Sequence, residues 1–496
     1  MVGSSNLPSP QRIVVRWILL SCLGWVVHPA PALLANDAVA AKPNIVVILA
    51  DDLGWGAVSY HSDFAETPNI DQFVAGGIEL DRFYVAPMCS PTRAGLMTGR
   101  YPIRFGLARA VIPPQRNFGL PVNERMLPEA LATAGYKRRG VFGKWHLGHH
   151  HIKWHPLSRG FTHFEGHYNG AIDYFDLTRE GERDWHVGFE PSPKQGYATD
   201  LIADAACRFI EQAAADEAPY FCYVPFNAPH SPFQAKAEDI SRYAQADKPT
   251  AEEKLKAMIW SMDQGIGRIL KTIQQTGESD NTQVWILSDN GGVGKFRQNN
   301  QPLRGSKLTT FEGGTRVIAS VRWPAQWKGE RKLEQRIGYI DLLPTVLTSA
   351  GLNPKLGEQP GRPLDGLPLN DLLADKTIEL PDRDWYSYHG QAGEQKETIS
   401  IHTADWKLIV VGPHIERNEI GTDHQLFLFE IGKDPLEKSN VANEHPQIVA
   451  ELTGKLIAHR SLQPATSVPT FGVGKQGFQP WQSWDIRRAE KSKDSP

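Results

Sequence analysis

Cysteine is scarce in this chain, with four residues among 496. Cys22 lies in an N-terminal apolar segment, which leaves Cys89, Cys207 and Cys222 for the rest of the protein. Three cysteines cannot form the disulfide framework that stabilises small secreted domains. Cys207 lies in a helical pattern and Cys222 in a strand-like run, so we expect both in the core. Cys89 fits neither description.

Strong net charge and long apolar runs are also missing. The formal net charge is −3 and no basic block is present, which argues against nucleic-acid binding. The apolar run at 17–27 is too short to span a bilayer comfortably. Arg12 and Arg16 precede this run and small residues follow it, as in a secretory signal peptide covering residues 1–41. We therefore expect a secreted or periplasmic protein without stable membrane insertion.

What is present is an ordinary globular composition, 41% hydrophobic and 22% charged, in a chain long enough for two domains. Several apolar runs have the character of buried parallel strands, and polar residues follow each of them. The runs are "NIVVILADDLG" with Asp51 and Asp52, "GVFGKWHLG" with Lys144 and His146, "YFCYVPFNAPH" with His230, and "QVWILSDNGG" with Asp289 and Asn290.

Helical patterns alternate with these strands, which predicts an α/β sheet covered on both faces. Ligands of such sheets bind beyond the carboxyl ends of the strands, so the polar residues are expected to converge on one pocket. The expected helices are 68–76, 91–98, 126–134, 199–214, 251–274 and 339–350.

The sequence pattern changes after about residue 380, where short antiparallel strands and a helix at 444–459 are expected. We predict a catalytic domain at 42–380, a smaller α+β subdomain at 381–480 and a disordered tail at 481–496.

The stretch "APMCSPTRAGLMTGR", residues 86–100, predicts a short helix with a thiol at its start. Ser90 suits the N-cap, Pro91 the first helical position and Gly99 the end. Cys89 would then lie at the positive end of the helix dipole, with Arg93 one turn inside, which suits anion binding. A buried free cysteine beside an ordinary helix explains this stretch equally well.

The same stretch resembles the first signature of the sulfatase family, Cys-x-Pro-x-Arg, through Cys89, Pro91 and Arg93. Similar motifs are "PNIVVILADDLGWG", "TPNIDQFVAGGI", "GKWHLG", "APHSPF", "SDNGG", "LRGSKLTTFEGGTRV" and "LFLFEIGKDPLEKSN". The resemblance implies a sulfuric ester hydrolase with an alkaline-phosphatase-like sandwich, built on a large, mixed and mostly parallel sheet. One segment departs from the family: Arg138 replaces an expected threonine, and the segment is one residue longer.

The resemblance also implies a cofactor set. In this family a formylglycine-generating enzyme oxidises the cysteine to formylglycine, and the hydrated aldehyde is the nucleophile. One Ca²⁺ is bound by oxygen ligands, which a hard cation prefers. The implied ligands are Asp51, Asp52, Asp289, Asn290 and the formylglycine made from Cys89.

The resemblance further implies a role for each remaining site residue. Arg93 holds the nucleophile, and His146 orients it and acts as a base. Lys144 and Lys307 contact the sulfate. His230 protonates the leaving alcohol.

Three functions stay open on the sequence. The first is a sulfatase, the second a phosphonate or phosphodiester hydrolase of the same superfamily, and the third a non-catalytic carbohydrate-binding protein on this fold. Asn290 stands where two-zinc relatives commonly have histidine, which favours one hard metal. The complete set of catalytic residues argues against the third function.

The substrate expected is a sulfated galactosamine or galactose unit at a chain end. Stretches near 160–176 and in the C-terminal strands resemble the arylsulfatase branch that includes N-acetylgalactosamine-4-sulfatase. His149, His150, Trp154 and Asn169 are expected at the pocket rim, where they could bind a sugar ring. The unusual stretch "HHHIKWHPLSR" is equally compatible with a solvated loop, whereas its spacing does not favour a metal tract.

We predict that Cys89 is formylglycine in active protein, because the run from Cys89 to Arg93 is intact. Mass spectrometry of the tryptic peptide 83–93 is the measurement, and Cys89→Ala is expected to remove turnover from a folded protein. Fully active enzyme with an unmodified Cys89 would contradict the prediction.

Overall fold

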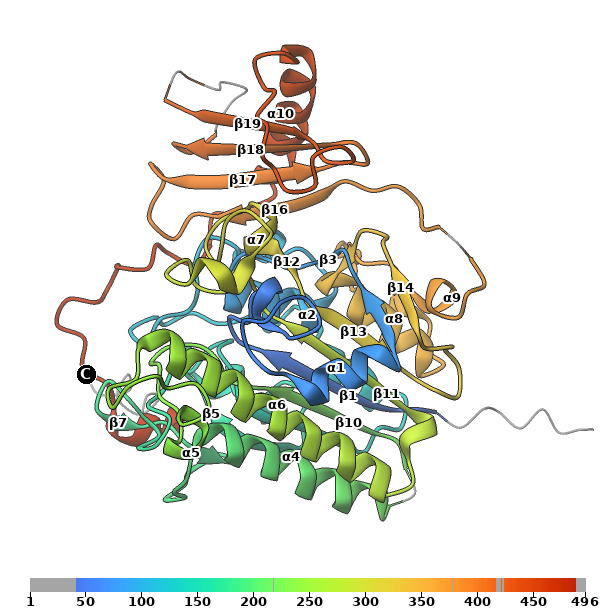
Figure 1. Cartoon of the computed structure of the whole chain (residues 1–496), viewed down its shortest axis with the longest axis vertical. Coiled ribbons are helices and arrows are strands. Elements are labelled where there is room, and N and C mark those ends of the chain that lie inside the picture. Colours follow the sequence, from blue (N-terminus) through green and yellow to red (C-terminus); the bar gives the residue numbers. More distant parts are fainter. Residues whose placement is uncertain (1–41, 217, 378, 416–420, 422, 488–496) are drawn as a thin grey trace, which may run out of the picture. The chain divides into compact units, whose positions relative to one another are not determined.

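A computed structural model describes residues 42–216, 218–377, 379–415, 421 and 423–487 (Figure 1). The expected signal peptide at 1–41 lies outside the described residues. A mixed ten-stranded sheet is the central element of the described part. In spatial order its strands are β14 (Arg331–Leu333), β2 (Ile78–Leu80), β13 (Ala319–Arg322), β11 (Thr282–Ser288), β1 (Asn44–Ala50), β10 (Tyr220–Pro225), β4 (Arg138–Lys144), β5 (His163–His167), β8 (His186–Val187) and β9 (Glu190–Pro191).

The centre of this sheet is parallel. β1 pairs in parallel with β11 and β10, β10 with β4, and β4 with β5, whereas β13 and β8 pair antiparallel with their inner neighbours. The four strands expected from the sequence are therefore adjacent, and the predicted α/β class is confirmed. Because parallel strands end at one edge, the polar residues that follow them meet there.

Helices cover both faces of the sheet. Along β1, Val46 and Ile48 pack into one hydrophobic core, whereas Val47 and Leu49 pack into the other, so the strand is buried on both sides. Figure 1 shows α4 and α6 running side by side across one face. That face carries α1 (Pro68–Ala75), α4 (Ala198–Ala214) and α6 (Ala251–Gln275); the other carries α2 (Cys89–Thr98), α3 (Leu127–Ala132) and α8 (Leu342–Ser349).

Helix α6 is continuous despite its two glycines. It begins with a capping box in which Thr250 Oγ1 accepts from the Glu253 amide at 3.2 Å and Glu253 accepts from the Thr250 amide at 2.7 Å. A Cβ atom at Gly267 would lie 2.4 Å from the side chain of Asn69 in α1. Glycine therefore allows the two helices to cross closely.

A second, antiparallel sheet with one covering helix forms the C-terminal region, as predicted. Its elements are β16 (Trp385–His389), β17 (Glu397–His402), β18 (Trp406–Gly412), β19 (Gln425–Glu430) and α10 (Pro446–Arg460). The boundary expected at 380 stays a prediction. The shorter elements of the described chain are β3 (Phe83–Tyr84), β6 (Thr178–Arg179), β7 (Glu182–Arg183), α5 (Ala237–Ile240), α7 (Glu312–Thr315), β12 (Arg316–Val317), β15 (Ile337–Gly338) and α9 (Asn370–Leu373).

The segment after α10 returns to the large sheet. Trp484 and Ile486 are fully buried, and the Trp484 indole donates to the Arg179 carbonyl at 2.9 Å. The prediction of a disordered tail is therefore wrong for 481–487, because this segment docks through its apolar residues; 488–496 lie outside the described residues. Among the described helices, none has the length and hydropathy needed to cross a bilayer.

A buried ion cluster joins the C-terminal sheet to the large domain. The Lys407 ammonium in β18 lies 2.6 Å from Glu312 Oε1 in α7 and 2.8 Å from Glu437 Oε1. All three side chains are almost inaccessible to solvent. Removing the ammonium would leave two adjacent carboxylates buried without the cation that lies between them, which is far more costly than losing a surface pair.

We therefore predict that Lys407→Met lowers the free energy of unfolding by about 3–5 kcal/mol. The matched control is Lys433→Met, which removes an exposed pair with Glu430 and is expected to cost less than about 1 kcal/mol. Urea denaturation followed by tryptophan fluorescence measures both. Equal losses in the two variants would contradict the importance of the buried cluster.

Candidate active site

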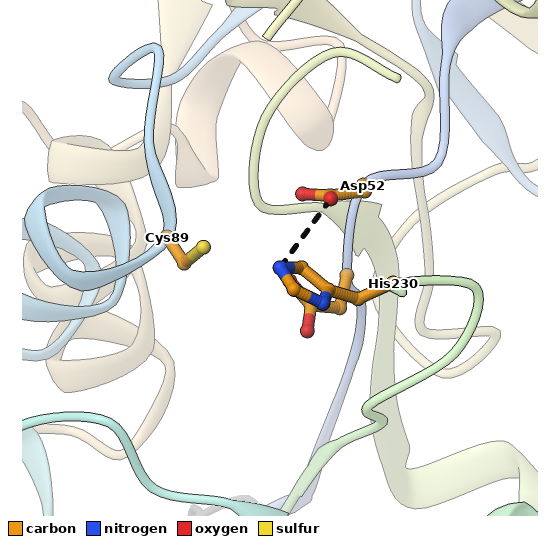
Figure 2. Close-up of side chains that lie close together, drawn as sticks. Asp52, Cys89 and His230 are labelled. Carbon is orange, nitrogen blue, oxygen red and sulfur yellow. Dashed lines mark ion pairs between the residues drawn. The ribbon is translucent and has the colours of Figure 1, made fainter. Parts of the chain in front are cut away.

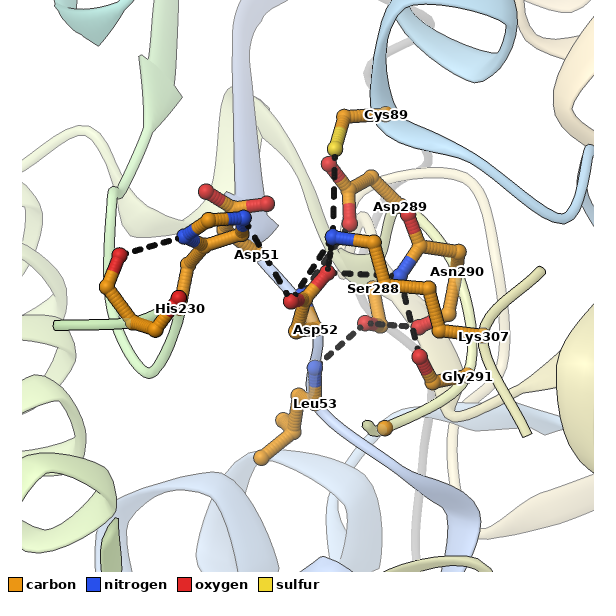
Figure 3. A network of polar contacts seen from close by, with 12 residues as sticks. Asp51, Asp52, Leu53, Cys89, His230, Ser288, Asp289, Asn290, Gly291 and Lys307 are labelled. Atoms are coloured by element: carbon orange, nitrogen blue, oxygen red, sulfur yellow. Dashed lines mark hydrogen bonds and ion pairs between the residues drawn. The ribbon is translucent and has the colours of Figure 1, made fainter. Parts of the chain in front are cut away.

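The acidic residues after β1 and β11 face one another at the carboxyl edge of the sheet (Figure 3). The Asp289 amide donates to the Ala50 carbonyl at 3.0 Å, and the Asp52 amide donates to Asp289 Oδ1 at 3.1 Å. Asp51, Asp289 and Asn290 are fully buried. The register of two neighbouring strands thus brings together three carboxylates that repel one another.

Each carboxylate has its own cation. Arg93 Nη2 lies 2.9 Å from Asp289 Oδ2, and Lys144 Nζ lies 2.6 Å from Asp51 Oδ2. Lys307 Nζ lies 2.6 Å and 2.8 Å from the two oxygens of Asp52. Although burial alone would raise the pKa of Asp52, Lys307 and neighbouring groups hold it well below its usual range. The structure thus brings together Asp51, Asp52, Lys144 and Asp289, which follow or end three of the four predicted strands.

Cys89 is the first residue of α2 and its side chain is buried. Its Sγ lies 3.6 Å from Lys307 Nζ. Figure 3 marks this contact with a dashed line. Met88 occupies the N-cap, so the expectation of Ser90 at that position is wrong; the Ser90 hydroxyl instead donates to the His146 carbonyl at 3.0 Å. Gly99 ends the helix with φ 68°, as predicted.

The unmodified Cys89 thiol is poorly suited to act as a nucleophile. Burial raises its pKa to about 11, despite the nearby ammonium groups of Lys144 and Lys307. A thiol attacks only as the thiolate, which is scarce at neutral pH when the pKa is so high.

Two histidines flank this centre with defined tautomers. His146 Nε2 lies 3.1 Å from the Ile112 carbonyl, which can only accept, so Nε2 carries the proton. His146 Nδ1 is buried and has no hydrogen-bond partner among the described residues. His230 Nδ1 lies 2.6 Å from the Ser231 carbonyl, and its Nε2 lies 3.7 Å from Asp52 Oδ2 (Figure 2). Burial lowers the pKa of both rings, that of His230 to about 3.

Unfavourable backbone conformations gather at the site. Asp52, His146 and Leu308 are non-glycine residues with φ values of 68°, 56° and 69°. Such conformations persist only where the surrounding structure enforces them, and they are common at functional sites. The positions of Asp52 and His146, and of the loop that carries Lys307, are therefore imposed by the fold.

A cavity of about 410 Å³ opens over the centre, within the range typical of ligand sites. Cys89, His146, His230 and Lys307 line its floor together with residues that sequence reasoning missed. The missed residues are Arg179, Gln391 and Phe471, which come from a hairpin, a turn and the returning C-terminal segment. No motif marks these positions, and only the tertiary fold brings them together.

The prediction of which residues form the rim of the cavity is wrong. His149 and Asn169 are fully buried, where His149 Nε2 bonds to the Pro114 carbonyl at 2.9 Å and the Asn169 amide donates to Asp184 at 2.9 Å. His150 Nε2 also lies 2.9 Å from that carbonyl, and Trp154 lines a separate groove. None of these four side chains lines the cavity.

The departure at Arg138 lies away from the chemistry. Arg138 is the first residue of β4 and pairs with Asp216, whereas Lys144 is the last residue of the same strand. Arg138 and Lys144 therefore lie at opposite ends of β4.

The donor set fits one hard cation. Asp51 Oδ1 and Asn290 Oδ1 are buried oxygens without a hydrogen-bond partner among the described residues. Burial, reinforced by Asp289 and Asp52 and opposed by Lys144, raises the pKa of Asp51 to about 8, which indicates a shortage of positive charge. Ligand atoms of Asp51, Asp52, Cys89 and His230 also lie within 4.8 Å of one another, so geometry alone adds His230 to the expected ligands.

Comparison with known proteins agrees with this geometry. The sulfatase family profile matches residues 43–352. N-acetylgalactosamine-6-sulfatase of Rattus norvegicus is 33% identical, over 97% of this chain and 95% of that protein, and arylsulfatase A of Homo sapiens is 30% identical, over 89% and 92%. The crystal structure of Ps i-CgsB in complex with k-i-k-neocarrahexaose superposes with a TM-score of 0.76 at 27% identity, covering 92% of this chain and 100% of that one.

The fold and the buried polar centre are those of a sulfuric ester hydrolase. The chain belongs to the sulfatase family. The expected resemblance to the 4-sulfatase branch stays a prediction, since the relative named above is a 6-sulfatase.

We predict that the protein binds one Ca²⁺ and is stabilised by it. Saturation at 100 times the dissociation constant is worth roughly 2.7 kcal/mol, so the melting temperature is expected to rise in Ca²⁺ relative to EDTA. Asn290→Ala, which removes one neutral ligand, is expected to reduce the shift, while the exposed Asn353→Ala leaves it unchanged. Two equivalents of zinc per chain by metal analysis would contradict a single hard-metal site.

Proposed function

We propose that this sulfatase hydrolyses sulfate esters on a carbohydrate, on a galactosamine or galactose unit at a chain end. Sulfate ester hydrolysis is supported by the position of Cys89, which lies beside Lys307 and lines the cavity, next to three buried carboxylates. A nucleophile, cations for the ester oxygens and proton carriers are therefore within one small volume.

Two groups complete the machinery. Formylglycine at residue 89 would supply a hydrated aldehyde as nucleophile. Asp51, Asp52, Asp289 and Asn290 would hold Ca²⁺, which would supply Lewis-acid chemistry to the site.

Three cationic side chains of this chain neutralise the negative charge. Lys307 already lies between Asp52 and residue 89, so its ammonium can contact an ester oxygen without leaving its carboxylate. Lys144 is held by Asp51 in the same way. Arg93 donates to Asp289 and to the Lys144 carbonyl, so it fixes the carboxylate and the lysine together. Such preorganised charges are worth most in a site that excludes water.

The histidines move the protons. His146 carries its proton on Nε2, so the unpartnered Nδ1 can accept a proton from residue 89. His230 directs Nε2 towards the centre, and a bound anionic ester beside it favours the protonated ring. His230, with Lys307, can then deliver a proton to the leaving oxygen.

The substrate class is supported by the relatives. One is named for N-acetylgalactosamine-6-sulfate chemistry, and a structural neighbour was crystallised with a neocarrahexaose. The signal-like N-terminus would bring the enzyme to extracellular or periplasmic glycans. A phosphonate or phosphodiester hydrolase is the alternative, and Asn290 in place of a histidine disfavours its two-zinc form.

We predict release of sulfate from chondroitin-derived oligosaccharides or sulfated galactans, with weaker turnover of an aryl sulfate and little of an aryl phosphate or phosphonate. Cys89→Ala prepared in parallel controls for contaminating activity. Sulfate release measured by ion chromatography is the readout. Release only from heparan fragments would reject the galactose-type assignment, and release from internal units of intact polymer would reject action at chain ends.

A further inference from the structure

The cavity over the active site has an uneven distribution of charge. Among the described residues that line it, none carries a carboxylate, and two are permanently cationic, Lys307 and Arg179. Lys307 is tied to both oxygens of Asp52. Within the part of the chain that the structure describes, Arg179 has only its neighbour Glu180 within ion-pair distance, at 3.2 Å. That pair is partly exposed, so it holds the guanidinium weakly.

The Arg179 side chain has unused donors. Its Nε is buried without a hydrogen-bond partner among the described residues, and the side chain as a whole is 29% exposed. A guanidinium presents five N–H donors in a fork that matches the oxygens of a carboxylate or a sulfate. Arg179 can therefore accept an anion from the cavity without losing a buried ion pair.

The backbone of Arg179 is held in place. It ends β6 and enters a tight turn in which Glu180 and Gly181 both have positive φ, 50° and 82°. The Trp484 indole donates to its carbonyl at 2.9 Å, and Glu182 in β7 accepts from the Ser483 amide at 2.7 Å. The C-terminal segment thus clamps the hairpin, which reduces the entropy lost when a ligand binds.

An aromatic side chain completes the same cavity. Phe471 lies on the C-terminal segment; its amide donates to the Gln391 carbonyl at 3.2 Å, and its carbonyl accepts from the Gln115 side chain at 2.9 Å. Phe471 is half-buried, so part of its ring is available to a ligand. An apolar ring beside a cationic fork suits a sugar that carries an anionic substituent.

We propose that Arg179, with Phe471, forms a subsite for a second anionic group of the substrate, beyond the sulfate ester that is cleaved. The substrate is then a saccharide with two oxyanions, the second being either a uronate carboxylate or a further sulfate. This inference rests on the proposed function, because it places the scissile sulfate at Cys89. Arg179 is a specificity residue; it takes no part in bond cleavage.

The test measures kcat and KM for four substrates: 4-nitrophenyl sulfate, a monosulfated neutral disaccharide, a monosulfated disaccharide containing a uronate, and a disulfated disaccharide. Wild type is compared with Arg179→Gln and Arg179→Lys. The matched control is Arg208→Gln, since Arg208 is an exposed arginine paired with Glu165 at 2.9 Å and does not line the cavity.

Arg179→Gln is expected to lower kcat/KM by roughly 10- to 100-fold for a dianionic disaccharide, mainly through KM, because charge-assisted hydrogen bonds are lost. The kcat/KM of Arg179→Lys for a dianionic disaccharide is expected to lie between those of wild type and Arg179→Gln, because lysine keeps the charge but lacks the forked donors of a guanidinium. Turnover of 4-nitrophenyl sulfate and of the neutral disaccharide stays within about twofold, which also verifies folding, and Arg208→Gln matches wild type throughout. The substrate with the larger loss identifies the carboxylate or the sulfate as the second anion.

An equal loss on all four substrates, no loss on either dianionic disaccharide, or a wild-type preference for the neutral disaccharide would overturn the subsite alone. A wild-type enzyme that releases no sulfate from any substrate but cleaves an aryl phosphonate would overturn the proposed function, and the subsite with it.

Discussion

The compensation of three buried carboxylates by three separate cations is the constraint on which this site depends. Asp51, Asp52 and Asp289 lie together because β1 and β11 are adjacent and parallel, and none of them could remain ionised there alone. Their cations come from α2, from the end of β4 and from the loop after β11. Segments distant in sequence must therefore be assembled before each carboxylate faces its cation, so the electrostatics of the site and its topology are inseparable.

The need to hold the cation Lys307 beside its carboxylate explains the role of the C-terminal sheet. Glu437 accepts from the amide of Glu312 at 2.8 Å, and the Arg304 side chain donates to the Glu437 carbonyl at 2.7 Å. The loop that delivers Lys307 lies between Arg304 and Glu312. The ion cluster around Lys407 thus fixes that loop from the second sheet, although no residue of the cluster lines the cavity.

Much of this architecture could be predicted from local patterns. The strands near Asp51, Lys144, His230 and Asp289 are rich in apolar residues, as expected for a sheet buried on both faces, and the polar residues that follow mark their ends. The predictions that were wrong concern side chains whose hydrogen-bond partners are distant in the sequence. The Ser90 hydroxyl does not cap α2, because it donates to the distant His146 carbonyl. His149 is buried, and its Nε2 bonds to the carbonyl of Pro114, 35 residues away in the sequence. Arg179 and Phe471 carry no signal at all, since their shared cavity exists only in the folded chain.

The docking of Trp484 on the Arg179 carbonyl has a consequence for the order in which the protein matures. Every side chain of the charged centre precedes residue 308, whereas one wall of the cavity is completed by Gln391 and Phe471, which lie much further along the chain. On an emerging polypeptide the groups of the reactive centre would all be present before Phe471 completes the wall of the cavity. Under the proposed subsite, removal of the segment from Phe471 onwards would release the Arg179 hairpin but leave Lys407 and Glu437 in place, so selectivity would be lost before activity.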